Sequence, residues 1–326
     1  MPELTYLEAI REGLREEMER DDRVLLLGED IGVYGGAFKV TEGLLARFGP
    51  DRVIDTPVAE AAIVGAAAGA AHMGLRPVCE MQFMDFISCA YDMLTNYVAT
   101  ARYRAGLATP LVVRGPCGGY VRGGPFHSQH VEAAFLHTPG LKLVAPATAR
   151  DAKGLIKAAI RDDDPVLYLE HKYLYRRIKE EVPADQDLLV PIGRARIARE
   201  GRDLSVVTYS AMVWKALAAA ERLEREDGLE IEVVDLRTLL PLDDEALAAT
   251  VRKTNRVLIV HEDTRTGGLA GEITARLNER CFEWLDAPIR RVCAHDVPLP
   301  YAPPLEDFVL PQTEDIVAAC RWLAAY

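Results

Sequence analysis

The sequence predicts an α/β protein built on mostly parallel β-sheets. Apolar runs of strand length alternate with helical patterns along almost the whole chain, and most of the runs are continuous. Continuous apolar runs are typical of parallel strands that helices cover on both faces. The length of 326 residues suggests two such domains, at about 100–200 residues per domain.

The elements of the first half follow from this alternation. An amphipathic helix is expected near the N-terminus, where Thr5 and Glu8 have the spacing of a capping box. We expect strands at residues 24–27, 53–54, 78–83, 111–114, 141–145 and 166–169, and helices at 58–73, 86–105 and 150–161.

A domain boundary is predicted where the alternation stops. Residues 171–193 are charged, contain two prolines and end in glycine. We therefore predict a first domain at 1–180, a linker at 181–194 and a second α/β domain at 195–326. The second domain should contain strands at 204–209, 231–235, 257–260 and 289–293, and helices at 211–226, 243–253, 268–284 and 313–324.

Composition excludes several classes of protein. The 38 basic and 50 acidic side chains give a net charge of −12, which disfavours nucleic acid or an anionic membrane as the main partner. A basic protein partner remains compatible with it. The six cysteines form no C-x-x-C pair, and the most apolar stretch, 58–75, contains Glu60 and His72. We expect a cytoplasmic protein with reduced thiols and no membrane span.

The first candidate site is the segment 55–60, where a strand ends and Pro57 is well placed as an early residue of a helix. Glu60 is either a first-turn carboxylate favoured by the helix dipole or a carboxylate placed for proton transfer in a pocket of small residues. Gly65 and Gly69, four residues apart, allow either tight packing of this helix on its own sheet or a subunit interface.

Two further segments have side chains suited to a binding site. Residues 80–86 place polar and aromatic groups at a strand end, where Phe83 or Phe86 either stacks on a flat ring or packs in the core. Residues 114–130 form a glycine-rich loop that lacks a phosphate-loop motif. Its His127 is a candidate acid–base group or a solvated side chain, and no further ligand completes a zinc site with His130. The sequence has no G-x-S-x-G motif, and nothing identifies a base for Cys117.

Taken together, these segments resemble one family along nearly the whole chain. The resemblance is to the β subunits of the thiamin-diphosphate-dependent 2-oxo acid dehydrogenases, the decarboxylating first component of the pyruvate and branched-chain complexes. It is carried by residues 28–30, 35–49, 55–60, 80–83, 114–116, 127–129, 139–141, 151–155, 159–162, 235–238 and 287–288. The family implies a transketolase-like fold, with a pyrimidine-binding domain followed by a smaller transketolase C-terminal domain. It also implies an α₂β₂ heterotetramer.

The resemblance also implies roles for single residues. Glu60 matches the glutamate that hydrogen-bonds N1′ of the aminopyrimidine, and Phe86 matches the aromatic ring that packs on it. Gln82 and Glu29 match polar groups that line the pocket. His127 matches a loop histidine that takes part in substrate binding and in acyl transfer to the lipoyl group.

Metal ions are expected in two places. Thiamin enzymes hold magnesium and diphosphate through a G-D-G motif, which this sequence lacks, so the α subunit should supply both contacts. The family often carries a structural potassium ion in the β subunit. The matching positions here are Leu111, Ala159, Ile160, Asp162 and Asp164, the last of which is often Asn in relatives.

The resemblance implies a lipoyl-acylating oxidoreductase that is active only with its α subunit. Residues 281–289 and 291–293 look branched-chain-like, as for an enzyme of 3-methyl-2-oxobutanoate, whereas 114–116 and 169–172 look closer to pyruvate enzymes. The alternatives are a pyruvate or acetoin dehydrogenase subunit and a non-catalytic scaffold of the same fold. The C-terminal domain should dock the acyltransferase core, with Asp286 and Tyr326 as contacts.

Overall fold

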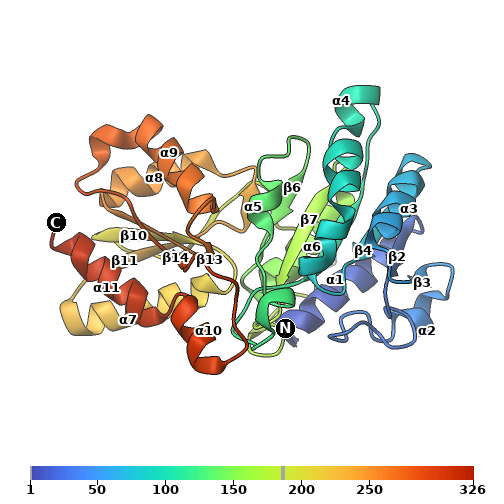
Figure 1. The fold of residues 1–326 in the computed structure, drawn as a ribbon, viewed down its shortest axis with the longest axis horizontal. Helices are drawn as coiled ribbons and strands as arrows, with labels where there is room; N and C mark the ends of the chain where they lie inside the picture. Colours follow the sequence, from blue (N-terminus) through green and yellow to red (C-terminus); the bar gives the residue numbers. More distant parts are fainter. Residues whose placement is uncertain (1, 185–187) are drawn as a thin grey trace. The chain divides into compact units, whose positions relative to one another are not determined.

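The computed structural model describes residues 2–184 and 188–326 and divides into two compact units (Figure 1). The first unit comprises Met1–Cys117 and Ala134–Ile192, and the second comprises Gly118–Ala133 and Gly193–Tyr326. The glycine-rich loop therefore groups with the C-terminal part of the chain. The domain limits predicted from the sequence, at 180 and 195, stay a prediction.

The first unit contains a parallel sheet with the strand order β6-β7-β5-β4-β2-β3. All six strands were expected, although the third was expected to extend to residue 83 and instead ends at Glu80. Their bounds are β2 (Val24–Gly28), β3 (Val53–Asp55), β4 (Arg76–Glu80), β5 (Val112–Cys117), β6 (Lys142–Val144) and β7 (Val166–His171).

Helices cover this sheet, as Figure 1 shows for α1 (Tyr6–Arg20), α3 (Glu60–His72) and α6 (Ala149–Arg161). The predicted capping box is confirmed, since Thr5 and Glu8 cap each other's backbone at the start of α1. Helix α1 packs on α6, where Lys157 Nζ lies 2.6 Å from Glu16 Oε2. The smaller elements of the unit are β1 (Glu3–Thr5), which pairs with β8 (Lys179–Glu181), and α2 (Leu44–Phe48).

Two helix predictions were wrong in detail. The helix expected at 86–105 is three pieces, namely the 3₁₀ segment η1 (Met84–Ala90), the π segment η2 (Met93–Val98) and α4 (Ala101–Ala105). The Thr95 and Thr100 hydroxyls donate to backbone carbonyls four residues earlier, and such bonds compete with a regular helix. Helix α3 begins at Glu60 after the N-cap Ala59, so Pro57 lies outside it.

The second unit has a sheet with the order β14-β13-β10-β11-β9, in which only β9 is antiparallel. The strands of this sheet are β9 (Arg196–Arg199), β10 (Leu204–Thr208), β11 (Ile231–Asp235), β13 (Val257–Thr264) and β14 (Arg290–Ala294), and the unit also contains the short strand β12 (Thr238–Leu240) outside it. Its helices are α7 (Met212–Asp227), α8 (Asp244–Thr254), α9 (Leu269–Cys281), α10 (Pro303–Val309) and α11 (Thr313–Ala324), with 3₁₀ turns η3 (Gly124–Phe126) and η4 (Phe282–Trp284). The short helix α5 (Glu132–Phe135) lies where the chain returns to the first unit. The helix expected at 268–284 ends as α9 at Cys281 and continues as η4.

In the residues that the structure describes, none of the helices has the length and apolar character needed to cross a lipid bilayer.

A buried ion network ties three strands of the first sheet together. Arg114 in β5 is 1% exposed and bonds to both Glu80, the last residue of β4, and Glu170 in β7, with Nη2 2.7 Å from Glu170 Oε2. Tyr175 donates a third bond to Glu170, at 2.7 Å. Burial raises the pKa of Glu80, with the charge of Glu170 acting in the same direction and Arg114 opposing it. One guanidinium thus holds two carboxylates at the carboxyl edge of the sheet.

Removal of this guanidinium should leave two buried carboxylates without a counter-charge. We expect Arg114→Met to lower the free energy of unfolding by about 3–5 kcal/mol, measured by urea denaturation. Adding Glu80→Gln and Glu170→Gln to Arg114→Met should recover most of that loss, because no charge is then stranded. Equal stability of the single and triple variants would contradict this assignment.

Candidate functional site

The carboxyl ends of β3, β2 and β4 bring four predicted site residues to one edge of the first sheet. Gly28 pairs with Asp55 on one side and with Glu80 on the other. Glu29 follows β2, Glu60 opens the helix after β3, and Gln82 and Phe86 follow β4. Ligands of open parallel sheets bind outside such carboxyl ends.

Glu29 and Glu60 form a buried acidic pair at this edge. Their exposed fractions are 4% and 8%. Burial raises the pKa of Glu29, and the nearby charge of Glu60 raises it further. Glu60 stands in the first turn of α3, where the helix dipole favours a negative charge. Between the strand and this helix, the buried Thr56 Oγ1 has no hydrogen-bond partner in the structure, so a hydroxyl is available to a bound polar ligand.

Gln82 and Phe86 provide the polar and aromatic sides of the same edge. Gln82 Nε2 donates to Asp30 Oδ2 at 3.5 Å, which places the amide beside the turn that follows β2. The Phe86 ring meets Phe83 edge-on at 6.0 Å between centroids, and Phe83 meets Phe38 in the same way at 5.5 Å. The half-buried Phe86 therefore belongs to an aromatic group and retains partial exposure to a ligand.

The outer face of α3 consists of small residues. Ala61, Ala62, Ala66 and Gly69 are exposed, and a Cβ at Gly69 would meet nothing within 4 Å. This face is therefore not used for packing on the helix's own sheet.

The glycine-rich loop is anchored within the second unit by carboxylates and backbone carbonyls. Gly119 N donates to Glu262, and Tyr120 Oη donates to Pro311 O at 2.7 Å. Arg122 Nη1 lies 2.6 Å from the buried Glu306 and 2.8 Å from Asp307. The half-buried His127 directly follows η3 in this anchored loop. His127 belongs to the second unit and Glu60 to the first.

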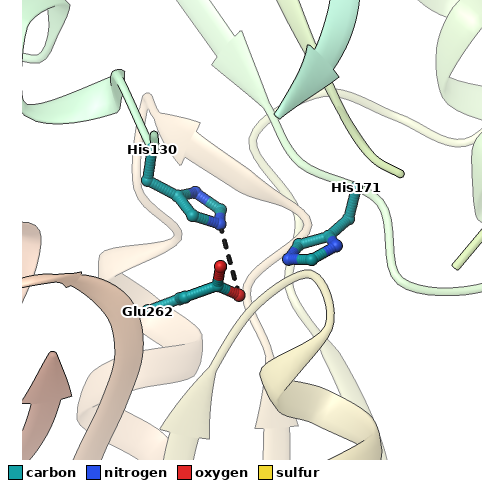
Figure 2. Close-up of side chains that lie close together, drawn as sticks. All are labelled: His130, His171 and Glu262. Carbon is teal, nitrogen blue, oxygen red and sulfur yellow. Dashed lines mark ion pairs between the residues drawn. The ribbon is translucent and has the colours of Figure 1, made fainter. Parts of the chain in front are cut away.

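The same loop contributes a buried histidine to an acidic cluster that the sequence analysis missed. His130 Nδ1 lies 3.1 Å from Glu132 Oε2, and Nε2 lies 3.5 Å from Glu262 Oε2, the ion pair dashed in Figure 2. Tyr209 donates to the other oxygen of Glu132. Burial opposes ionisation of Glu132, but the charge of His130 and the two hydrogen bonds lower its pKa to about 2. The sequence shows no further ligand near His127 and His130 for a zinc site, whereas the fold brings two carboxylates to His130.

A cavity of about 580 Å³ opens beside this cluster within the second unit. Phe126, Val297 and Leu299 give it apolar walls, and Glu262, Asp263 and Asp296 line it with carboxylates. Burial raises the pKa of Asp263 to about 7, with the charge of Glu132 adding to the rise, whereas burial lowers the pKa of His261 to about 4.

The remaining predicted residues are two docking contacts in the second unit and five potassium positions in the first. Asp286 is exposed after η4, and Tyr326 is 63% exposed with its ring 5.3 Å from Trp322. The five positions predicted for potassium lie before β5 and around the turn between α6 and β7, where several of their oxygens already accept hydrogen bonds from Arg76 and Arg102.

The chain is similar to known proteins in both sequence and structure. The family models of the transketolase pyrimidine binding domain and the transketolase C-terminal domain match residues 2–177 and 193–316. The chain is 51% identical to the 2-oxoisovalerate dehydrogenase subunit beta of Bacillus subtilis (strain 168), with 100% of both chains covered. It is 44% identical to the pyruvate dehydrogenase E1 component subunit beta of Staphylococcus aureus (strain COL), with 98% of both chains covered. A solved split gene transketolase, an inactive beta4 tetramer, has a TM-score of 0.80 at 24% identity and covers 99% of this chain and 98% of its own.

The two α/β units thus have the transketolase-like fold expected from the sequence. The chain belongs to the β subunits of the 2-oxo acid dehydrogenases, which are oxidoreductases that decarboxylate 2-oxo acids. The resemblance stated from the sequence is therefore confirmed.

The raised pKa of Asp263 predicts a pH-dependent effect of substitution. In the folded protein this pKa lies near 7, compared with a usual value of 3.8. Between these two pH values the folded state therefore holds a proton that the unfolded state has released. The stability that this uptake provides is complete below pH 3.8 and is lost as the pH rises through 7.

Asp263→Asn should therefore raise Tm at pH 8, by about 3 °C or more, and change it little at pH 4. The matched control is Asp296→Asn in the same cavity, where hydrogen bonds from Thr266 lower the pKa, so no gain is expected at pH 8. An equal shift of Asp263→Asn at both pH values, measured by calorimetry, would refute this interpretation.

Proposed function

We propose that this β subunit acts with an α subunit on branched-chain 2-oxo acids such as 3-methyl-2-oxobutanoate, and transfers the acyl group to the lipoyl group of an acyltransferase core. The observation that carries the proposal is the buried Glu60 at the carboxyl edge of the first sheet, beside Glu29. The 51% identity to a 2-oxoisovalerate dehydrogenase subunit supports the substrate class.

The edge of the first sheet fits the aminopyrimidine of thiamin diphosphate. The buried Glu60 carboxylate can form a hydrogen bond with a ring nitrogen, and Phe86 offers an apolar surface to the ring. The Thr56 hydroxyl, which has no hydrogen-bond partner in the described part of the chain, can bind a polar group of the ligand. When bound, thiamin diphosphate would supply a nucleophilic carbon and an electron sink for decarboxylation of the 2-oxo acid. Glu60 would hold the proton at N1′, with Glu29 and Gln82 lining the pocket and Phe86 orienting the ring.

Magnesium and the diphosphate would belong to the α subunit, because this chain lacks a G-D-G motif. The assembly would be an α₂β₂ heterotetramer. The exposed face of small residues on α3 would allow close approach of another subunit's helix, with Glu60 at its end.

His127 would act on the substrate and in acyl transfer from the anchored loop. The bonds of Arg122, Tyr120 and Gly119 to their partners in the second unit limit the motion of that loop. The acyltransferase core would dock on the C-terminal domain near Asp286 and Tyr326, which are both exposed, and the negative charge of the chain suits a basic docking domain.

A pyruvate or acetoin dehydrogenase subunit is the second candidate. The 44% identity to a pyruvate dehydrogenase subunit supports it. A non-catalytic scaffold is disfavoured because Glu60 and His127 are both present.

Reconstitution tests the proposal. The chain is co-expressed with its α subunit. Decarboxylation of 3-methyl-2-oxobutanoate and of pyruvate is then assayed with and without thiamin diphosphate, in the presence of an artificial electron acceptor. We expect activity that needs both chains and a higher kcat/KM for the branched-chain acid. Preference for pyruvate would transfer the assignment to a pyruvate dehydrogenase subunit, and a stable heterotetramer inactive on both acids would contradict both the branched-chain and the pyruvate assignments.

Glu60→Gln should lower kcat by about 100-fold or more, because the amide cannot exchange a proton with N1′. Assembly with the α subunit and the Tm of the complex should stay unchanged. The conservative control Glu29→Gln should lose less, since Glu29 would line the pocket without contacting N1′. Near-normal turnover by Glu60→Gln would rule out its role in proton transfer.

His127→Ala should separate the two half-reactions. We expect acyl transfer to free lipoyl domain to fall about tenfold or more, while thiamin diphosphate affinity stays the same. The control is Gln129→Ala on the exposed side of the loop, expected to be neutral in both assays. Equal rates of acyl transfer by wild type and His127→Ala would show that His127 is only a loop residue.

A further inference from the structure

The turn that follows α6 holds three consecutive aspartates, Asp162 to Asp164, in contact with basic side chains from elsewhere in the first unit. These are Arg76 at the start of β4, Arg102 in α4 and Lys142 at the start of β6. The family resemblance predicts that this turn and Leu111 hold a potassium ion. The prediction requires that the oxygen atoms at these positions be available to the ion.

Two of the predicted backbone ligands bind one nitrogen atom. Arg76 Nη1 donates to Ile160 O at 2.9 Å and to Asp162 O at 3.0 Å. Each of these two carbonyl oxygens therefore already faces a positively charged nitrogen, and an ion bound to both would lie close to the guanidinium. The Arg76 side chain is 14% exposed, so its charge is largely withdrawn from water.

The other predicted ligands also have donors. Leu111 O accepts from Val166 N at 2.9 Å, and Ala159 O accepts from Asp162 N at 3.3 Å. Arg102 Nε donates to Asp164 Oδ1. Each of the five predicted positions thus has an oxygen engaged by a hydrogen-bond donor of the protein itself.

The charges of the turn are matched without an ion. Lys142 Nζ donates to both carboxylate oxygens of Asp162 at 2.7 Å, and Arg76 Nη2 lies 2.6 Å from Asp163 Oδ1. Arg102 pairs with Asp164 in the same way. The three aspartate carboxylates are therefore matched by three cationic side chains, those of Lys142, Arg76 and Arg102. A further cation between these carbonyls would lie beside Arg76 and be repelled by it, most strongly where the charge is buried.

We propose that Arg76 takes the place of the potassium ion in this chain. The turn between α6 and β7 is held by an internal guanidinium, assisted by Arg102 and Lys142, and its stability needs no monovalent metal ion. Asp164, which stands where relatives often have Asn, then serves as the partner of Arg102 rather than as a ligand. This inference does not depend on the proposed substrate or reaction.

The test compares salts. The Tm of the full chain is measured in potassium chloride, sodium chloride and choline chloride at equal ionic strength, about 0.1 M so that surface charges are screened alike. We expect the same Tm in all three salts. A Tm that rises with potassium and saturates, with no such rise in choline chloride, overturns the proposal.

A variant examines the guanidinium itself. Arg76→Met should lower Tm in choline chloride by about 4 °C or more, because two carbonyls and Asp163 lose a charged donor. Potassium chloride should restore part of the loss, since the freed carbonyls can then accept an ion. The control is Arg47→Met, an exposed arginine that pairs with Glu19 at the surface, expected to keep the wild-type Tm. Wild-type stability of Arg76→Met in choline chloride contradicts the proposal, and Arg76→Lys, which retains a cation, provides the comparison if the methionine variant does not fold.

Discussion

The buried guanidinium of Arg114 is the constraint on which the first unit depends. Its charge lies out of water and therefore requires the carboxylates of Glu80 and Glu170, which come from the strands on either side. This requirement sets the carboxyl ends of β4, β5 and β7 together. The same network also packs against the segment after β2. A Cβ added at Gly36, which has a φ of +81°, would lie 3.0 Å from Glu80 Oε1. The two segments that bear Glu29, Gln82 and Phe86 are thus supported by one ion network.

Both units have buried carboxylates near the carboxyl ends of their parallel strands. In the first, Glu29 and Glu60 share a buried edge, where burial and the nearby charge of Glu60 raise the pKa of Glu29. In the second, Glu132 and Glu262 hold His130, and Glu262 also binds the backbone of the glycine-rich loop. The loop that bears His127 is therefore positioned by buried carboxylates, and its glycines leave the backbone free to follow those contacts. The aspartate turn after α6 follows a related pattern, with basic side chains taking the place of an ion.

Much of the fold could be predicted because its signals are local. Continuous apolar runs identified all the parallel strands of the first sheet, the Thr5–Glu8 spacing identified the first helix, and the strand end before Glu60 identified the edge of the site. The rest depends on contacts between distant residues. Arg114 was visible as a charge in an apolar strand, but its partners lie 34 and 56 residues away. One of the carboxylates that meet His130 comes from β13. The break in the 86–105 helix coincides with bonds from threonine hydroxyls that only the folded backbone reveals.

The central claim is that the carboxyl edge of β3, β2 and β4 holds the aminopyrimidine through Glu60. A structure of the complex with the α subunit and thiamin diphosphate tests it most directly. The account predicts a Glu60 carboxylate oxygen about 2.6–3.2 Å from N1′, within hydrogen-bond reach, with Phe86 against the ring. A pyrimidine ring bound elsewhere, or one whose N1′ faces another side chain, would contradict it.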